Sequence, residues 1–393
     1  MKRFNPIRRD KPSRGLPQPQ RNGQGGIDTG PRNVELDRQN PDLLTPPPTD
    51  RGTLPNMKFP FSLAHTRIEE GGWTREVTQR ELPIATTLAG VDMKLNPGAY
   101  RELHWHKESE WAYVLEGSCR IGVVDQDGRN FLDDVEQGDL WFFPKGVPHY
   151  IQALEEGVEF LLVFDDGAFS ENSTFMVSDF FAHTPKSVLA KNFGWTPEQM
   201  AAMPEKEKYI FYGEVPPPLD DSERVVSPTG EVPRTFKHRM LAQTPLRFDG
   251  GTVRITDSTN FAAATTISAA LVELEPGALR ELHWHPTDDE WQYYISGFGR
   301  MGVFAGSGLA RTYDFHAGDV GYVPFAYGHY IENLGTKPLV FLEMFRNPRF
   351  EDISAAQWMA NTPAQVSADT LNLPRSMIEA LPKEKRSILP ATR

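Results

Sequence analysis

The stretch Gly98-Ala-Tyr-Arg101-Glu-Leu-His104-Trp-His106-Lys-Glu-Ser-Glu110-Trp111 recurs 179 residues later as Gly277-Ala-Leu-Arg280-Glu-Leu-His283-Trp-His285-Pro-Thr-Asp-Asp-Glu290-Trp291. A third histidine follows each copy, in Pro-Lys-Gly-Val-Pro-His149 and in Pro-Phe-Ala-Tyr-Gly-His329. The chain therefore carries two sets of three histidines and one glutamate. The simplest interpretation is two copies of one fold, each with a metal site.

The repeat extends well beyond the histidines. Gly71-Gly72 matches Gly250-Gly251, and Thr184-Pro185 matches Thr362-Pro363. A repeat this long indicates a duplicated domain rather than a solenoid of short units. After the proline-rich stretch at 215–219 and the turn at 227–230, we place a boundary that predicts domains at 56–233 and 234–393.

Residues 1–55 are predicted to form an extended basic arm. The first 40 residues hold nine Lys or Arg against four Asp or Glu, are rich in Pro, Gly, Gln and Asn, and lack an apolar period. The whole chain has a net charge of −12, which argues against nucleic acid as a partner. We find no secretion signal and no apolar run long enough for a bilayer, so we expect a cytoplasmic protein without a membrane partner. The single cysteine, Cys119, excludes an internal disulfide and a thiolate metal cluster.

Within each copy the local pattern favours β-structure. Short apolar or alternating runs, separated by Gly and Pro turns, are typical of an all-β sandwich or barrel; they lie at 86–95, 110–115, 160–164, 271–275, 290–295 and 339–343. Helical signals are confined to short segments at 185–192, 196–203, 355–359 and 376–381. We therefore expect two tandem all-β domains with short helical appendages.

The two histidine sets have the chemistry of metal ligands. Histidines at positions i and i+2 of a strand point to the same face, and a later Glu and His complete a set of three nitrogens and one oxygen. Six of the ten histidines fall at these matched positions. Four protein ligands on an octahedral ion would leave two positions for substrate or O2. Imidazole and carboxylate suit Mn, Fe, Ni, Cu or Zn, and the residues alone do not choose among them.

The motifs also resemble a known family. Gly98-x5-His104-x-His106-x3-Glu110-x6-Gly117 and Gly138-x5-Pro144-x-Gly146-x2-His149 resemble the two cupin motifs, and the second copy matches with Ala326 in place of a motif glycine. Over residues 55 to 385 the chain resembles the bicupin oxalate decarboxylases. That resemblance implies two jelly-roll barrels, Mn(II) in each, and a trimer or a homohexamer built as a dimer of trimers. The implied reaction converts oxalate to formate and CO2, with O2 as a co-catalyst that is needed but not consumed.

The resemblance also assigns residues to the chemistry. Arg101 and Arg280, three residues before each histidine pair, would bind and polarise oxalate. Since an odd spacing on a strand reverses the side chain, a local bend must bring each arginine into its site. Glu171, in Ser170-Glu-Asn-Ser173, would be the proton-carrying glutamate of an active-site lid.

The two copies are unequal in their acids. Aligning Phe160-Leu-Leu-Val-Phe164 with Phe341-Leu-Glu-Met-Phe345 places Glu171 opposite Asp352, and Leu162 opposite Glu343. We therefore expect principal turnover in the N-terminal copy and treat Glu343 as an auxiliary acid near the second metal. Tyr209 and Tyr293 are weaker candidates, because a buried tyrosine commonly serves only to satisfy a hydrogen bond.

Three alternatives stay open at this point. An oxalate oxidase would use the same metal site and produce H2O2 and CO2, but the lid glutamate favours decarboxylation. A non-enzymatic binding or storage bicupin is disfavoured because both ligand sets are complete. A dioxygenase for aromatic diols is mildly disfavoured by two arginines suited to a small dianion.

Overall fold

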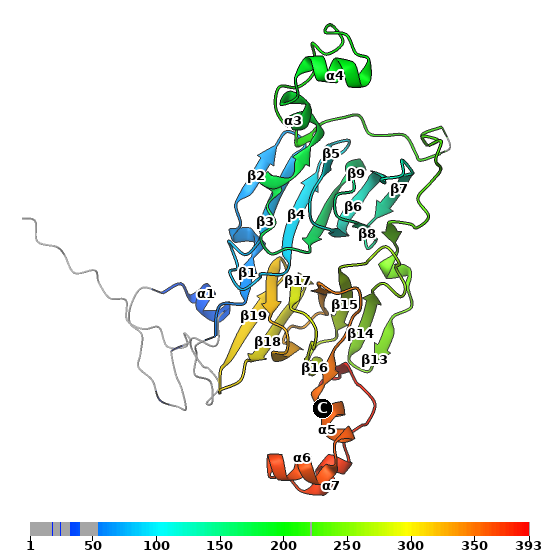
Figure 1. Cartoon of the computed structure of the whole chain (residues 1–393). Coiled ribbons are helices and arrows are strands. Elements are labelled where there is room, and N and C mark those ends of the chain that lie inside the picture. The colour runs from blue at the N-terminus through cyan, green and yellow to red at the C-terminus, as the bar shows by residue number, and fades with distance from the viewer. Residues whose placement is uncertain (1–17, 19–23, 25–31, 40–53, 221, 393) are drawn as a thin grey trace, which may run out of the picture.

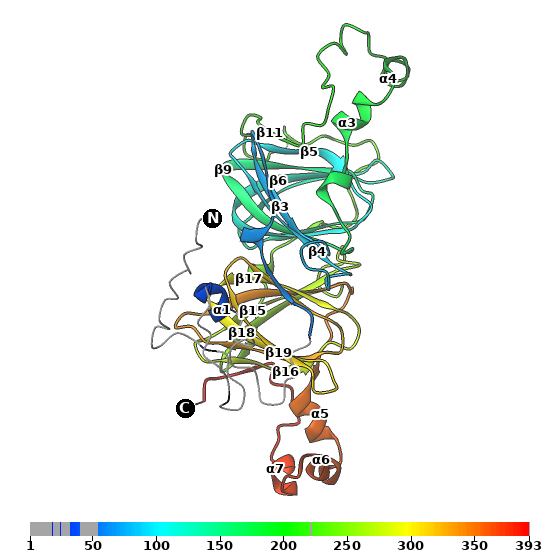
Figure 2. The same cartoon turned by 90° about the vertical axis from the view of Figure 1, so that its left-hand side faces the viewer.

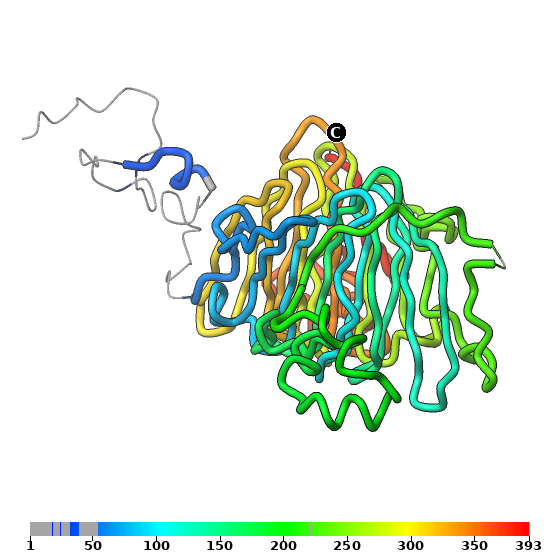
Figure 3. The backbone as a smooth tube through the Cα atoms, turned by 90° about the horizontal axis from the view of Figure 1, so that it is seen from above, coloured from blue at the N-terminus to red at the C-terminus, as the bar shows by residue number. Residues whose placement is uncertain are grey.

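The computed structural model describes residues 18, 24, 32–39, 54–220 and 222–392, and it forms two β domains stacked along one axis (Figures 1 and 2). Most of the predicted basic arm lies outside the described residues. Its helix α1 (Val34–Gln39) lies beside the C-terminal domain, and Figure 3 shows it at the side of the stack. No helix in the described ranges is long and apolar enough to cross a membrane.

The first domain is built from antiparallel strands that form two faces of a barrel. These strands are β2 (Thr66–Glu69), β3 (Gly72–Val77), β4 (Ala89–Leu95), β5 (Tyr100–Trp105), β6 (Glu110–Val124), β7 (Asn130–Glu136), β8 (Leu140–Phe143), β9 (His149–Phe164), β10 (Phe175–Met176) and β11 (Ile210–Phe211). The long strands β6 and β9 belong to both faces, so the sheet runs continuously around the corner.

Gly117 makes that corner possible. The register between β6 and β9 shifts on both sides of it, and its φ of 75° is disfavoured for residues with a side chain. A Cβ at this position would lie 2.1 Å from the carbonyl oxygen of Gly157. The motif glycine is therefore needed for the sharp bend that carries one strand across both faces.

The second domain repeats the arrangement with separate strands. They are β13 (Leu246–Phe248), β14 (Gly251–Thr256), β15 (Ser268–Leu274), β16 (Leu279–Trp284), β17 (Glu290–Ser296), β18 (Phe298–Phe304), β19 (Ala310–His316), β20 (Asp319–Val323), β21 (Gly328–Asn333), β22 (Leu339–Phe345), β23 (Ile353–Ser354) and β24 (Ile388–Leu389). β17 and β18 together correspond to β6, and β21 and β22 together correspond to β9. The predicted mainly β fold, with two tandem domains and short helices, is confirmed.

Each domain lends a strand to the other. β1 (Lys58–Pro60) pairs with β20 of the second domain, and β12 (Lys237–His238) pairs with β8 of the first. Buried Lys58 binds Asp319 at 2.9 Å, which fastens the exchanged strand. The predicted boundary at 233/234 stays a prediction, and β12, which follows it, pairs with the sheet of the first domain.

The contact between the domains is packed as tightly as a core. A single cluster of buried apolar side chains includes residues of both domains. Gly90 lets the domains approach closely, since a Cβ there would lie 2.2 Å from the indole of Trp291. This cluster joins the two domains, and the second domain also has a separate buried cluster of its own.

Short helices project from opposite ends of the stack (Figure 1). They are α3 (Val177–Ala182), α4 (Lys186–Phe193), α5 (Ala355–Asn361), α6 (Ala364–Leu371) and α7 (Arg375–Glu379), with single 3-10 turns at Phe61–Leu63, Glu171–Ser173 and Met240–Ala242. Pro185 and Pro363 cap α4 and α6, so the repeated Thr-Pro pairs mark true helix starts. The helix expected at 196–203 is wrong: that segment forms turns, and Pro204 ends it by supplying no N–H donor.

Candidate metal centres

The structure brings the eight predicted ligands together in two groups. β5 and the residue after it carry His104 and His106, β6 begins with Glu110, and β9 begins with His149. In each domain the four ligand atoms lie within 4.8 Å of one another and are buried; the second group is His283, His285, Glu290 and His329. The end of one strand and the starts of two others, from distant parts of the sequence, thus converge inside each barrel.

Main-chain carbonyls fix the tautomer of all six imidazoles. Each Nδ1–H donates to a carbonyl oxygen at 2.6 to 2.9 Å; in the first domain the acceptors belong to Glu102, Glu108 and Val147. A carbonyl can only accept, so the proton resides on Nδ1. Each Nε2 lone pair is therefore free to face the centre of the site, as metal ligation requires.

These ligand atoms fit a divalent cation. The Nε2 atoms of His149, His283, His285 and His329 and Oε2 of Glu290 are buried without a hydrogen-bond partner. Unsatisfied buried polar atoms are costly, and a cation at their common centre would satisfy them. Nitrogen and carboxylate donors without thiolate suit Mn, Fe or related borderline ions. The chain therefore holds two three-histidine, one-glutamate metal sites.

The electrostatics at Glu110 and His104 favour the forms that bind a metal. Burial alone would raise the pKa of Glu110, but its contacts with His149 and His106 outweigh burial and lower that pKa. Burial, together with the nearby charge of Arg101, holds the pKa of His104 well below its usual range. The carboxylate is thus anionic and the His104 imidazole neutral.

A different donor orients the ligating carboxylate in each domain. In the first domain the indole N–H of Trp141 donates to Oε1 of Glu110 at 2.8 Å. In the second, the amide of Gln292 donates to Oε1 of Glu290 at 2.7 Å, and Gly321 stands where the first domain has Trp141. Trp141 pairs with Ala112, and Gln292 pairs with Gly321. Each domain thus places one large and one small side chain at this position, but on opposite strands.

A local bend in β5 brings Arg101 into the first site, as the spacing of three residues between Arg101 and His104 requires. Pairing between β5 and β9 shifts register between Arg101 and His104, because three steps on β5 match two steps on β9. The extra residue turns the guanidinium to the ligand side of the strand. Arg101 is 2% exposed and lies against the ring of Tyr209, with Cζ 4.3 Å from its centroid. The same shift places Arg280 in the second site.

Glu171 lies beside that arginine. Its Oε2 accepts a hydrogen bond from Arg101 at 3.0 Å and one from the hydroxyl of Tyr209 at 2.6 Å. The carboxylate is buried, although it stands on a single 3-10 turn in a loop. Burial lowers the pKa of His106, but Glu110 above all, and to a smaller extent the charge of Glu171, raise that pKa. The loop acid thus belongs to the metal site.

The second site is more crowded with charge. Arg280 donates to Glu343 at 3.1 Å and to Asp352 at 2.8 Å. Lys385 also binds Asp352, and burial and the charge of Arg280 lower the pKa of Lys385 to about 8. The first domain has Leu162 where the second has Glu343, so Arg101 faces one carboxylate and Arg280 faces two.

Comparison with known proteins agrees with this geometry. A cupin family model matches the chain twice, at residues 61–201 and 239–379. The chain is 58% identical over 374 residues to oxalate decarboxylase OxdC of Bacillus subtilis, covering 95% of this chain and 97% of that protein. It is 43% identical over 383 residues to a probable oxalate decarboxylase of Arthroderma benhamiae, covering 96% and 95%. A structure of the B. subtilis enzyme, from work on its Mn(II) centres, superposes with a TM-score of 0.93 at 57% identity, covering 96% of this chain and 100% of that one.

This chain is a cupin of the oxalate decarboxylase family.

Three aromatic residues of this bicupin lie where their sequence positions do not indicate. Tyr209, a weaker candidate from the sequence, contacts Glu171; its φ of 60°, uncommon for an aromatic residue, has no sequence signal. Tyr293, ranked beside it, packs against Phe61 at the domain contact, and no contact with either ligand set places it in a metal site. Trp141 was missed because its contact with Glu110 depends on strand pairing.

Proposed function

We propose that this bicupin splits oxalate monoanion into formate and CO2 at the metal centre of its first domain, with Arg101 and Glu171 as the groups that act on substrate. The observation that carries this proposal is the buried contact of Glu171 with Arg101 and Tyr209 beside the first ligand set. The high identity with oxalate decarboxylases over nearly the whole chain supports it.

The ion in both centres is proposed to be Mn(II), since the relative of known structure has Mn(II) centres. When bound, it would supply a Lewis-acidic, redox-active centre for oxalate and for O2, which we expect to be required but not consumed.

Arg101 binds and orients the oxalate carboxylate and stabilises its negative charge. Binding there competes with the contact between Arg101 and Glu171, so substrate entry and movement of Glu171 are linked. Burial strengthens the interaction, because little water screens the charges.

Glu171 then moves one proton twice. It accepts the proton of the bound monoanion; the bond between the two carbons breaks and CO2 leaves; and Glu171 returns the same proton to the remaining carbon, forming the C–H bond of formate. The atoms balance as HC2O4⁻ giving HCO2⁻ and CO2, with no net oxidation. Tyr209 holds the carboxylate of Glu171 in place between the two transfers.

The second centre is proposed to be auxiliary. Arg280 could bind oxalate as Arg101 does, but Glu343 and Asp352 already engage its guanidinium. Glu343 is assigned there as an auxiliary acid. A carboxylate substrate would have to displace these partners, so we expect most turnover in the first domain.

One assay tests the reaction. Mn-loaded protein is incubated with oxalate at mildly acid pH, with and without O2, and formate, CO2 and H2O2 are measured. We expect formate in large excess over H2O2, no turnover without O2, and a rate that falls toward neutral pH as the monoanion disappears. Stoichiometric H2O2 would indicate an oxidase, and the absence of any product would indicate a binding protein.

We also propose a trimer or a hexamer of two trimers. The helical appendages expose large apolar side chains, among them Phe180 at 55% and Trp358 at 60%, which association would cover. Light scattering should give the mass of three or six chains, and a monomer would contradict this. The cytoplasmic location stays a prediction from the sequence, with cell fractionation as its test.

A further inference from the structure

The loop that carries Glu171 is longer than its counterpart in the second domain. Phe169 packs on His106 at 6.3 Å between ring centroids, as Phe350 packs on His285 at 6.1 Å. Beyond the loop, β10 and β23 pair in the same way with the strands that carry the histidine pairs. Residues 170–174, which we call the lid, lie between these fixed points, whereas the second domain has only 351–352. Because the lid has more residues between its two fixed ends, its backbone has more conformational freedom.

The lid is also free of the metal ligands, unlike its counterpart. In the second domain Nδ1–H of His285 donates to the carbonyl of Glu351 at 2.8 Å, which ties that segment to a ligand. In the first domain His106 donates to Glu108, outside the lid. The lid can therefore move without changing the orientation of a ligating imidazole.

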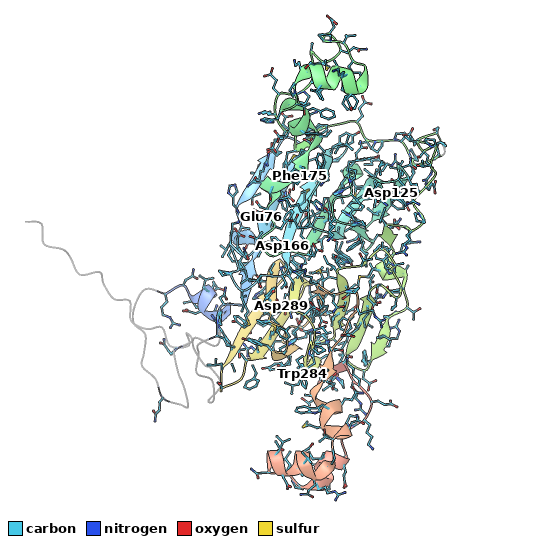
Figure 4. The ribbon with its side chains drawn as sticks, viewed as in Figure 1. Glu76, Asp125, Asp166, Phe175, Trp284 and Asp289 are labelled. Atoms are coloured by element: carbon cyan, nitrogen blue, oxygen red, sulfur yellow. The ribbon has the colours of Figure 1, made fainter. Side chains whose placement is uncertain are left out.

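Glu76 holds the main chain of the lid. Its Oε2 accepts a hydrogen bond from the backbone N–H of Glu171 at 3.0 Å, and its Oε1 binds Arg80. The other hydrogen bonds made by main-chain N–H groups within the described lid are internal to residues 170–174. Figure 4 shows Glu76 between Asp166 and Phe175, the labelled residues that flank the lid in sequence. One carboxylate of β3 thus fastens the lid backbone to the barrel.

The second domain has no such acceptor. Strand pairing places Ile255 at the position of Glu76, and its side chain cannot accept a hydrogen bond. There is also room for the lid to leave. Glu76, Glu171 and Asn172 line a cavity of about 350 Å³, and none of the metal ligands lines it.

We propose that Glu76 is a latch that holds the lid closed and so keeps Glu171 against Arg101 and Tyr209. Glu76 is a positioning residue, since it touches the backbone of Glu171 and not its carboxylate. The consequence for catalysis rests on the proposed role of Glu171 as proton carrier, whereas the latch itself does not. When the latch is broken, the lid is open for a larger fraction of time. Glu171 is then less often in position to donate the proton that forms formate.

The experiment measures lid opening directly. A glutamyl endopeptidase cleaves after Glu171 only when the lid is open, and mass spectrometry follows that single cleavage in the full-length, Mn-loaded protein. Glu76→Ala should raise the cleavage rate about tenfold, the effect of losing one hydrogen bond to a charged group. Glu76→Gln keeps an oxygen acceptor but loses the charge and the pairing with Arg80, so its rate should lie between. Glu81→Gln is the matched control, because Glu81 lines the same cavity but binds Thr78 rather than the lid.

Product analysis gives the second measurement. In Glu76→Ala the ratio of formate to H2O2 should fall while metal content and thermal midpoint stay near those of the unmodified protein. Unchanged cleavage after Glu171 in Glu76→Ala, or in Glu76→Gln if the alanine variant does not fold, would overturn the latch. If Glu76→Ala is cleaved faster but the unmodified protein makes no formate, the latch is supported and the proposed reaction is rejected, so the two failures are distinguishable.

Discussion

Glu171 and Asp352 occupy matching positions in the two domains, and each accepts a hydrogen bond from the arginine that precedes its histidine pair. Arg101 donates to Glu171 at 3.0 Å, and Arg280 donates to Asp352 at 2.8 Å. The matched pairs differ in what surrounds them. Glu171 sits on the longer lid with Tyr209, whereas Asp352 is held by Lys385 on a short segment. Duplication has thus produced one acid on a longer loop and one on a short segment bound by a lysine.

The first prediction concerns Glu171 itself. Glu171→Gln keeps the shape of the side chain but cannot carry a proton, so formate production should fall by at least about 100-fold. Residual flux should shift toward H2O2, and metal content should not change. Product assays together with metal analysis measure this. Asp352→Asn is the control and should retain most activity. A dead Asp352→Asn or Glu343→Gln beside an active Glu171→Gln would move catalysis to the second domain.

The hydroxyl of Tyr209 is expected to matter for the rate. Tyr209→Phe removes the hydrogen bond to Glu171 and keeps the ring against Arg101. A hydrogen bond to a charged group contributes about 1.5–3 kcal/mol, so formate production should fall roughly tenfold or more. Steady-state kinetics on oxalate measure this. Tyr293→Phe, at the domain contact, should behave like the unmodified protein, and an equal loss in both variants would refute the assignment.

Metal content should follow the two ligand groups. The two buried sets predict about two Mn ions per chain after expression with added Mn. His104→Ala and His283→Ala should each lose about one ion, because three remaining ligands hold the ion less well. His104→Ala should abolish turnover, and His283→Ala should lower the thermal midpoint, since bound metal stabilises the folded state. Full activity at near-zero occupancy would reject the metal sites.

Asp92 predicts a pH effect on stability that is separate from catalysis. It is 1% exposed and pairs with Arg75 at 2.7 Å, yet burial raises its pKa from 3.8 to about 6. The folded state therefore binds more protons than the unfolded state between these values. The stability from this group is complete below pH 3.8 and is lost as pH rises through about 6.

Asp92→Asn removes the cost of burying that charge. It should raise the free energy of unfolding by about 1–3 kcal/mol at pH 7.5 and change it little at pH 4. Denaturant unfolding of the Mn-loaded protein at both pH values measures the difference. If Asp92→Asn destabilises the protein at pH 7.5, the ion pair with Arg75 contributes more free energy than burial of the Asp92 charge costs.

The amino-acid sequence alone determined the duplication, the mainly β fold and the eight metal ligands. It could do so because these features are local or repeated: His104 and His106 share a strand face by their spacing, and the second copy repeats the same spacing at His283 and His285. The sequence also predicted that Arg101 needs a bend. These inferences depend only on the geometry of a strand, which is the same in every fold.

Only the tertiary structure decided what surrounds those ligands. Tyr209 lies 38 residues from Glu171 and Glu76 lies 95 residues from it, so strand pairing and packing alone bring them together. The exchange of β1 and β12 between domains likewise has no local signal, because short strands are defined by their partners. Spacing along the chain predicts which side chains share a strand face, but the closing of a barrel determines which distant side chains meet.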